Sequence, residues 1–168
     1  MHDNLSRLQS LPLLSLALIE GMAIGGGAEI ATSCDFRLFA SGAQMGFVHI
    51  RIGIVSAWGG GSRLSQLIGS QKALDLMLSG RIVDSSEAQQ MGLADGVVTE
   101  EGAESEALDW LNKYTKHSVE TVRAVKRIVN GVRYLPLEVA LKAEVEHSAS
   151  VWGSLAHKRG LENNIKHK

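Results

Sequence analysis

The chain has 168 residues, of which 45% are hydrophobic and 21% are charged, and its formal net charge is −1. This composition is typical of one soluble domain with a hydrophobic core, and the near-neutral charge offers no general attraction to nucleic acid or anionic membranes. The single cysteine, Cys34, excludes an intrachain disulfide, and the six scattered histidines lack cysteine partners at the spacing of a structural zinc site, so no metal is expected.

The most apolar stretch lies between Arg7 and Glu20. It is shorter than the roughly 20 residues that a helix needs to cross a bilayer. The N-terminal residues also lack the small-residue cleavage site of a signal peptide. We therefore predict an intracellular protein without a membrane span.

The first half of the chain alternates between strand and helix patterns. The apolar run 11–21 (LPLLSLALIEG) is typical of a strand buried on both faces. Residues 27–34 predict a short helix, residues 35–40 a second strand, and residues 43–50 a further strand or extended segment. From Gly59 onward helical spacing dominates. This order predicts an α/β core with a helical C-terminal subregion.

Several helix ends are marked by capping residues and glycines. The predicted start and stop residues are Ser70 and Gly80 for one helix and Asp84 and Gly92 for the next, with Glu87 completing a capping-box pattern. Ser118 begins a later helix, and Pro136 is expected in the first turn of the helix after it. The helix after Ser118 carries an apolar stripe of Val119, Val122, Val125, Val129 and Val132.

Three consecutive glycines, residues 25–27, stand between the first apolar run and a helix start. They do not complete a dinucleotide fingerprint, because Ile30 occupies its last position, and they do not form a P-loop, because Gly27 and Ala28 replace its Lys and Ser or Thr. Two interpretations remain. The glycines permit close packing of the helix on the strand, or their outward N–H groups bind an oxyanion.

Three segments carry a resemblance to a known family: ALIEGMAIGGGAEIATSCDFRLFA, MGFVHIRIGIVSAWGGGSRLSQLIG and LSGRIVDSSEAQQMGLADGVV. In order and spacing the chain resembles the crotonase (enoyl-CoA hydratase/isomerase) superfamily from about residue 8 to its end. FVHIRIGI, SAWGG and the tail VWGSLAHKRGLENNIKHK are most similar to the branch of this superfamily that decarboxylates ethylmalonyl-CoA or methylmalonyl-CoA.

The resemblance implies a crotonase-like spiral of ββα units that assembles as a trimer or a dimer of trimers. It also implies binding of an acyl-CoA thioester, with coenzyme A as part of the substrate and no separate cofactor. We expect a single domain over residues 1–168, with a core at 8–99 and a helical region at 100–168. The expected compartment is the cytosol, and a mitochondrial location stays open.

The same resemblance assigns site residues. It implies an enolate held by two backbone N–H groups, of which Gly26 supplies one, with Gly25 beside the substrate. Glu29 matches the first of two catalytic carboxylates of the hydratases, but His49 stands where the second is expected. A decarboxylase needs only to orient the substrate carboxylate, stabilise the oxyanion and supply one proton, and an imidazole serves for the first or the last.

These residues also have structural interpretations. His49 could be a hydrogen-bonded core histidine, and Glu29 could favour the positive end of its own helix. Trp58 is expected as a wall of the substrate pocket or a core aromatic. Lys158, with Arg159, either binds CoA phosphates or lies on a solvated basic face.

The resemblance further implies ββα turns ahead of this chain, including an Ala-x-Ala-Gly-x-Asp-like segment that binds adenine and supplies the other oxyanion N–H. Nothing in residues 1–11 matches that segment. We therefore expect the chain to be an N-terminally truncated form, with most CoA contacts outside it. Three functions stay open: part of a decarboxylase, an enoyl-CoA hydratase/isomerase, or a catalytically silent interaction subunit with the crotonase fold.

Overall fold

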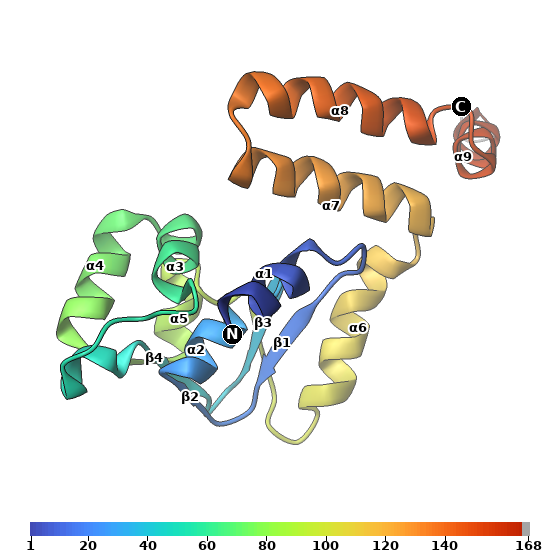
Figure 1. Ribbon diagram of the computed structural model, residues 1–168. Coiled ribbons are helices and arrows are strands. Elements are labelled where there is room, and N and C mark those ends of the chain that lie inside the picture. Colours follow the sequence, from blue (N-terminus) through green and yellow to red (C-terminus); the bar gives the residue numbers. More distant parts are fainter. Residues whose placement is uncertain (166–168) are drawn as a thin grey trace. The chain divides into compact units, whose positions relative to one another are not determined.

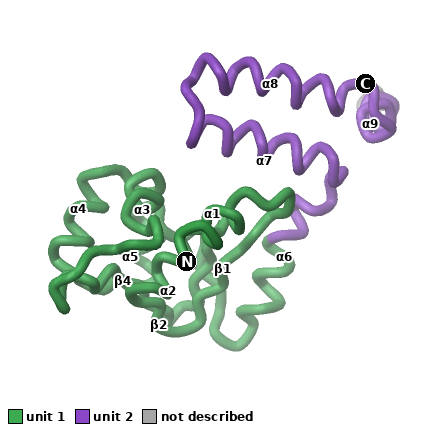
Figure 2. The backbone as a smooth tube through the Cα atoms, in the orientation of Figure 1, with its two compact units in different colours: residues 1–110 green, residues 111–168 purple. Residues whose placement is uncertain are grey.

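The structure is a computed structural model that describes residues 1–165. The last three residues of the tail motif, 166–168, lie outside the described residues. The chain divides into two compact units, residues 1–110 and the residues from Leu111 onward (Figure 2). Each unit is described by itself.

The first unit contains a three-stranded parallel sheet (Figure 1). Its order is β1 (Leu16–Ile19), β3 (Phe36–Ala40) and β6 (Gly96–Val98). Leu38 lies opposite Leu18 on one side and Gly96 on the other. Leu38 and Phe39 have no exposed surface, so the central strand lies in the hydrophobic core.

A second sheet of three short strands lies in the same unit. Its order is β2 (Met22–Ile24), β4 (Gln44–Gly46) and β5 (Ile82–Asp84), with β2 parallel and β5 antiparallel to β4. β1 and β2 follow one another in the chain, and each is the outermost strand of its sheet. Among the described residues neither strand has a partner on its outer edge.

The helices of the first unit follow and connect the strands of these sheets, and two of them carry predicted site residues. They are α1 (His2–Ser10), α2 (Gly26–Ala31), the 3-10 helix η1 (Val48–Ile52), α3 (Gly60–Ile68), α4 (Ser70–Ser79) and α5 (Ser85–Met91). The helix α6 (Ala103–Thr115) begins in the first unit and ends in the second. α2 follows β2 and η1 follows β4, each after one residue, so the parallel pairing of β2 with β4 brings these two helices together.

The second unit is helical. It contains α7 (Val119–Tyr134), α8 (Leu137–Val151) and α9 (Leu155–Ile165). α7 and α8 pack against each other, joined by the turn at Leu135 and Pro136 (Figure 1). The predicted apolar stripe of α7 is mostly uncovered, because Val119, Val125, Val129 and Val132 are each more than half exposed in this chain.

The α/β class with a helical C-terminal region is confirmed, and so are several helix ends. Asp84 caps α5 by accepting from the Glu87 N–H at 2.8 Å, and Ser118 caps α7 by accepting from the Thr121 N–H. Gly80 and Gly92 end α4 and α5 in the left-handed conformation, which glycine adopts at little cost.

Other boundaries were wrong. The run 11–21 does not form one strand, because β1 covers only its second half and the chain then turns at Gly21 into β2. Ser70 makes no capping bond, since Gly69 is the N-cap of α4. Pro136 is the N-cap of α8 and does not lie within its first turn. The antiparallel strand β5 lies between two predicted helices, where the sequence pattern indicated no strand.

Candidate active site

The glycine run adopts the conformation that a helix start next to a sheet requires. Gly25 has φ +53° and ψ −118°, in the left-handed region that favours glycine. Its N–H donates to the Gly46 carbonyl at 3.0 Å, which ties the end of β2 to the end of β4. Gly26 is the first residue of α2, so its N–H belongs to the turn that has no partner within the helix.

Gly26 is required for a different reason, which is the close approach of Trp58. A Cβ at position 26 would lie 2.5 Å from Cζ3 and 2.8 Å from Cη2 of the indole ring. Trp58 therefore packs against the start of α2, beside the candidate oxyanion donor. At Gly27 a Cβ would meet only the Ala23 side chain, at an ordinary 3.9 Å. The close packing at Gly26 is therefore against Trp58 rather than against the strand, and the binding of an oxyanion by its N–H stays a prediction.

Glu29 is buried on α2, with 3% of its side chain exposed. Its Oε2 accepts from the Trp58 N–H at 2.8 Å and from the Gly60 N–H at 2.9 Å. Gly60 is the first residue of α3, so the carboxylate binds an N–H group that the helix itself leaves unpaired. Glu29 therefore lies near two positive helix ends. One is the first turn of its own helix, α2, as expected, and the other is the start of α3.

His49 lies on η1 and faces Glu29. The His49 Nε2 is 3.1 Å from the Glu29 Oε1, and the side chain is 12% exposed. An ionised carboxylate only accepts hydrogen bonds, so opposite an ionised Glu29 the shared proton belongs to Nε2. The other ring nitrogen, Nδ1, is buried and has no hydrogen-bond partner among the described residues. A buried polar atom without a partner is costly, and such atoms occur at functional sites.

The loop of residues 58–60 is held from its other side by Arg63 of α3. The Arg63 Nη1 donates to the Trp58 carbonyl at 2.8 Å, and its Nε donates to the Gln9 side chain of α1 at 3.1 Å. Sequence reasoning did not identify Gly60, Arg63 or Gln9. Arg63 lies among the apolar residues of an amphipathic helix, and this pattern could have indicated a buried arginine with a structural role.

The predicted residues thus fall into two groups. Gly25, Gly26, Glu29, His49 and Trp58 come together at the start of α2. Lys158 is exposed on α9 in the second unit, and its role in binding CoA stays a prediction.

The described residues offer no metal centre, since no three His, Cys, Asp or Glu side chains gather closely enough within them to hold an ion. None of the helices in the same part of the chain combines the length and apolarity needed to cross a membrane.

Comparison with known families gives this geometry a context. The family of enoyl-CoA hydratase/isomerase matches residues 1–166. The chain therefore belongs to the enoyl-CoA hydratase/isomerase family, and the crotonase fold is confirmed. An enoyl-CoA hydratase structure from Bacillus anthracis superposes with a TM-score of 0.93 at 28% identity, over 99% of this chain and 65% of that one. A structure of a Thermobifida fusca protein in complex with CoA superposes with a TM-score of 0.82 at 26% identity. The match covers 89% of this chain and 58% of that one.

Two curated relatives carry a more specific name. The ethylmalonyl-CoA decarboxylase of Xenopus tropicalis is 46% identical over the whole of this chain, and that of Gallus gallus is 43% identical over 99% of it. The chain spans 57% of the length of each of these relatives.

Proposed function

We propose that this chain contributes the catalytic residues of a carboxy-lyase that decarboxylates acyl-CoA thioesters of the ethylmalonyl-CoA or methylmalonyl-CoA type. The similarity to named decarboxylases supports the substrate class. The direct contact between His49 and Glu29, with the buried Nδ1 left over, is the observation that carries the reaction type.

The contact argues against a hydratase. Hydration by two carboxylates needs a water held between them, and one catalytic group must take the proton of that water. Here the second position is an imidazole, and its Nε2 lies 3.1 Å from Glu29 Oε1. That distance is a direct hydrogen bond and leaves no space for a water between the two groups.

The N–H of Gly26 would bind the thioester oxygen. It lies at the start of α2, where unpaired N–H groups and the helix dipole favour negative charge. A fixed donor aimed at a developing enolate oxygen lowers the barrier, typically by about 3 kcal/mol for one such donor. Trp58 beside it would limit the access of water and shape the space around the acyl group.

His49 would supply the proton. When the ring takes up a second proton, this proton lies on Nδ1, and the Glu29 carboxylate stabilises the cation through Nε2–H. Because Nδ1 is buried here, substrate binding must open a path to it, and the Nδ1–H would then orient the substrate carboxylate. The bond between that carboxylate and the α-carbon then breaks, CO2 leaves, and its electron pair forms the enolate. Transfer of the Nδ1 proton to the α-carbon gives the shortened acyl-CoA, and the ring regains a proton from solvent.

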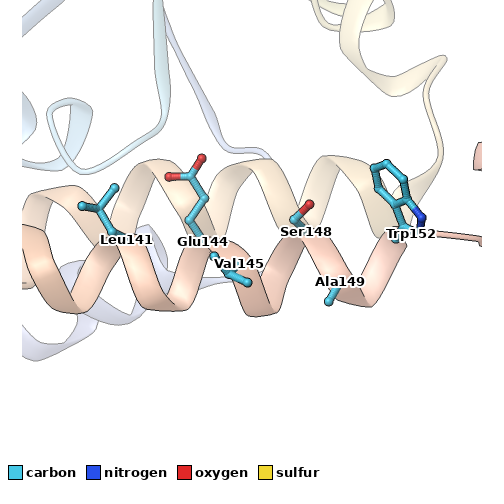
Figure 3. Close-up of a pocket in the computed structure, with 6 residues that line it drawn as sticks. All are labelled: Leu141, Glu144, Val145, Ser148, Ala149 and Trp152. Carbon is cyan, nitrogen blue, oxygen red and sulfur yellow. The ribbon is translucent and has the colours of Figure 1, made fainter.

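Assembly into trimers or dimers of trimers is part of the proposal, and it is supported by exposed apolar surface on the second unit. A pocket along α8 is lined by side chains from Leu141 to Trp152, the residue that follows the helix (Figure 3). Val145 is 70% exposed there and Trp152 is 76% exposed. The same surface favours the second candidate function, a catalytically silent subunit that acts through assembly. The cytosol is the proposed compartment.

The test measures CO2 release from ethylmalonyl-CoA and hydration of crotonyl-CoA by the same protein. Because the relatives are longer, it uses the longest product of the gene that contains this chain, called here the full-length protein. We expect decarboxylation, and a loss of about 10²-fold or more in His49→Ala, the usual range for a positioned acid or base.

His2→Ala, on the exposed face of α1, is the control and should retain activity. Normal decarboxylation by a folded His49→Ala protein would show that the histidine is structural. Efficient hydration of crotonyl-CoA by the unmutated protein would show that the decarboxylase assignment is wrong, and absence of both activities would favour the silent subunit.

A further inference from the structure

Arg63 is a buried charge held by neutral groups. It is 6% exposed, and its guanidinium donates to the Gln9 side-chain oxygen, the Trp58 carbonyl and, at 3.3 Å, the Ser6 hydroxyl. Among residues 1–165 no carboxylate forms an ion pair with it. Burying a guanidinium without a carboxylate is costly unless its hydrogen bonds are well satisfied, so a specific role for these bonds is expected.

The hydrogen bonds of Arg63 connect α1 to the loop of residues 58–60. Gln9 is 2% exposed on α1, and the loop lies on the other side of the guanidinium. The guanidinium packs closely on the loop, since a Cβ at Gly59 would lie 2.9 Å from the Arg63 Nη1. Gly59 has φ +89°, so this position is reserved for glycine by conformation as well as by space.

The opposite side of this loop holds Glu29. Trp58 accepts from Arg63 through its carbonyl and donates to Glu29 through its N–H. A shift of the loop would therefore move both N–H groups that fix the Glu29 carboxylate, and with it the oxygen that faces His49.

We propose that Arg63 is a positioning residue for the Glu29–His49 pair, which it aligns by fixing the 58–60 loop against α1. The proposal deepens the decarboxylase function and rests on it for its effect on catalysis. Its structural part is that Arg63 keeps the neutral His49 ring protonated on Nε2. This part can be tested even if the protein has no activity.

The test compares two conservative variants of buried arginines. Arg63→Lys keeps the charge but cannot reach three acceptors at once, because its ammonium lacks the guanidinium fork. Arg37→Lys is the matched control: Arg37 is 2% exposed on β3, and its side chain binds Asp95 and the Leu93 carbonyl, away from the 58–60 loop. Both proteins lose a buried guanidinium, and only one of them loses the loop contact.

The first measurement is long-range 1H–15N correlation spectroscopy of the histidine rings in the full-length protein, with His49 assigned from the His49→Ala spectrum. We expect the unmutated protein and Arg37→Lys to carry the neutral-ring proton on Nε2. Arg63→Lys should lose this single pattern and show exchange between the two nitrogens. A His49 pattern that is unchanged in folded Arg63→Lys overturns the proposal, whether or not the protein is active.

The second measurement is the kinetics of CO2 release. Arg63→Lys should lower kcat by about 10-fold or more, since small misplacements of reacting groups carry costs of that order, and KM should stay within about twofold. Equal effects in both arginine variants would mean that the loss is one of general stability, and would overturn the catalytic part. If Arg63→Lys does not fold, Gln9→Met decides: an altered His49 pattern supports the proposal, and a native pattern contradicts it.

Discussion

Replacing Glu29 by glutamine tests the candidate site with the smallest change of shape. The glutamine carbonyl can take the place of Oε2 and accept from the Trp58 and Gly60 N–H groups. Its amide NH2 then faces the His49 Nε2, where the carboxylate oxygen had been. Two donors cannot share one hydrogen bond, so Nε2 must become the acceptor and the ring proton must move to Nδ1.

The size of the stability effect follows from the two loop contacts. A hydrogen bond to a charged group contributes about 1.5–3 kcal/mol and a neutral one about 0.5–1.5 kcal/mol. Two such bonds become neutral in Glu29→Gln, so the free energy of unfolding should fall by about 2 kcal/mol. Glu29→Ala leaves both N–H groups unpaired in a buried place, at about 1–3 kcal/mol each, and should cost about 2–6 kcal/mol.

Catalysis should suffer more than stability. The glutamine cannot stabilise a ring that is protonated on both nitrogens, and the Nδ1–H of a neutral imidazole is a poor acid. We expect CO2 release by the full-length protein to fall by about 10²-fold in Glu29→Gln.

Urea unfolding, histidine ring spectra and CO2 release are measured together on this variant. Glu20→Gln, at an exposed position after β1, is the control and should match the unmutated protein in all three. Wild-type turnover by a Glu29→Gln protein whose ring proton has moved to Nδ1 would refute the role of the pair.

Three further outcomes are expected. Gly26→Ala should destabilise the fold by about 1–3 kcal/mol in urea unfolding, because the new Cβ overlaps the Trp58 ring. Adding Trp58→Leu should restore most of the loss, and no rescue would contradict the overlap. Asp84→Ala should cost about 1 kcal/mol through loss of the α5 cap, whereas Ser70→Ala, which removes no cap, should cost little; equal losses would disprove the capping assignment. The 168-residue chain should self-associate in light scattering after size exclusion, and Val145→Glu on the exposed face of α8 should reduce it; a compact monomer at high concentration would argue against this.

The features that sequence predicted well depend on neighbours in the chain. The caps at Asp84 and Ser118 bind N–H groups three residues away, and the glycine ends of α4 and α5 require only a local left-handed conformation. The grouping of Gly26, Glu29 and His49 was predicted through the family resemblance, which carries three-dimensional information that periodicity lacks.

The features that sequence missed depend on contacts between distant segments. Glu29 binds N–H groups 29 and 31 residues further along, and no local pattern predicts that a helix residue will satisfy the start of another helix. β5 has only three residues and is defined by its pairing with β4. The continuous apolar pattern of residues 11–21 predicts one strand, whereas only β1 forms within it and the turn at Gly21 leads the chain into β2 of the other sheet.

The double use of Glu29 constrains how this protein can evolve or be engineered. One carboxylate holds the start of α3 and also faces His49, so selection for folding and selection for chemistry act on the same side chain. Aspartate is one methylene too short to reach both the start of α3 and His49. Alanine can bind neither of them. Glutamine has the same length as glutamate, but its amide NH2 moves the ring proton of His49 from Nε2 to Nδ1. A new reaction in this scaffold would therefore require a second substitution that supports α3 before position 29 could vary freely.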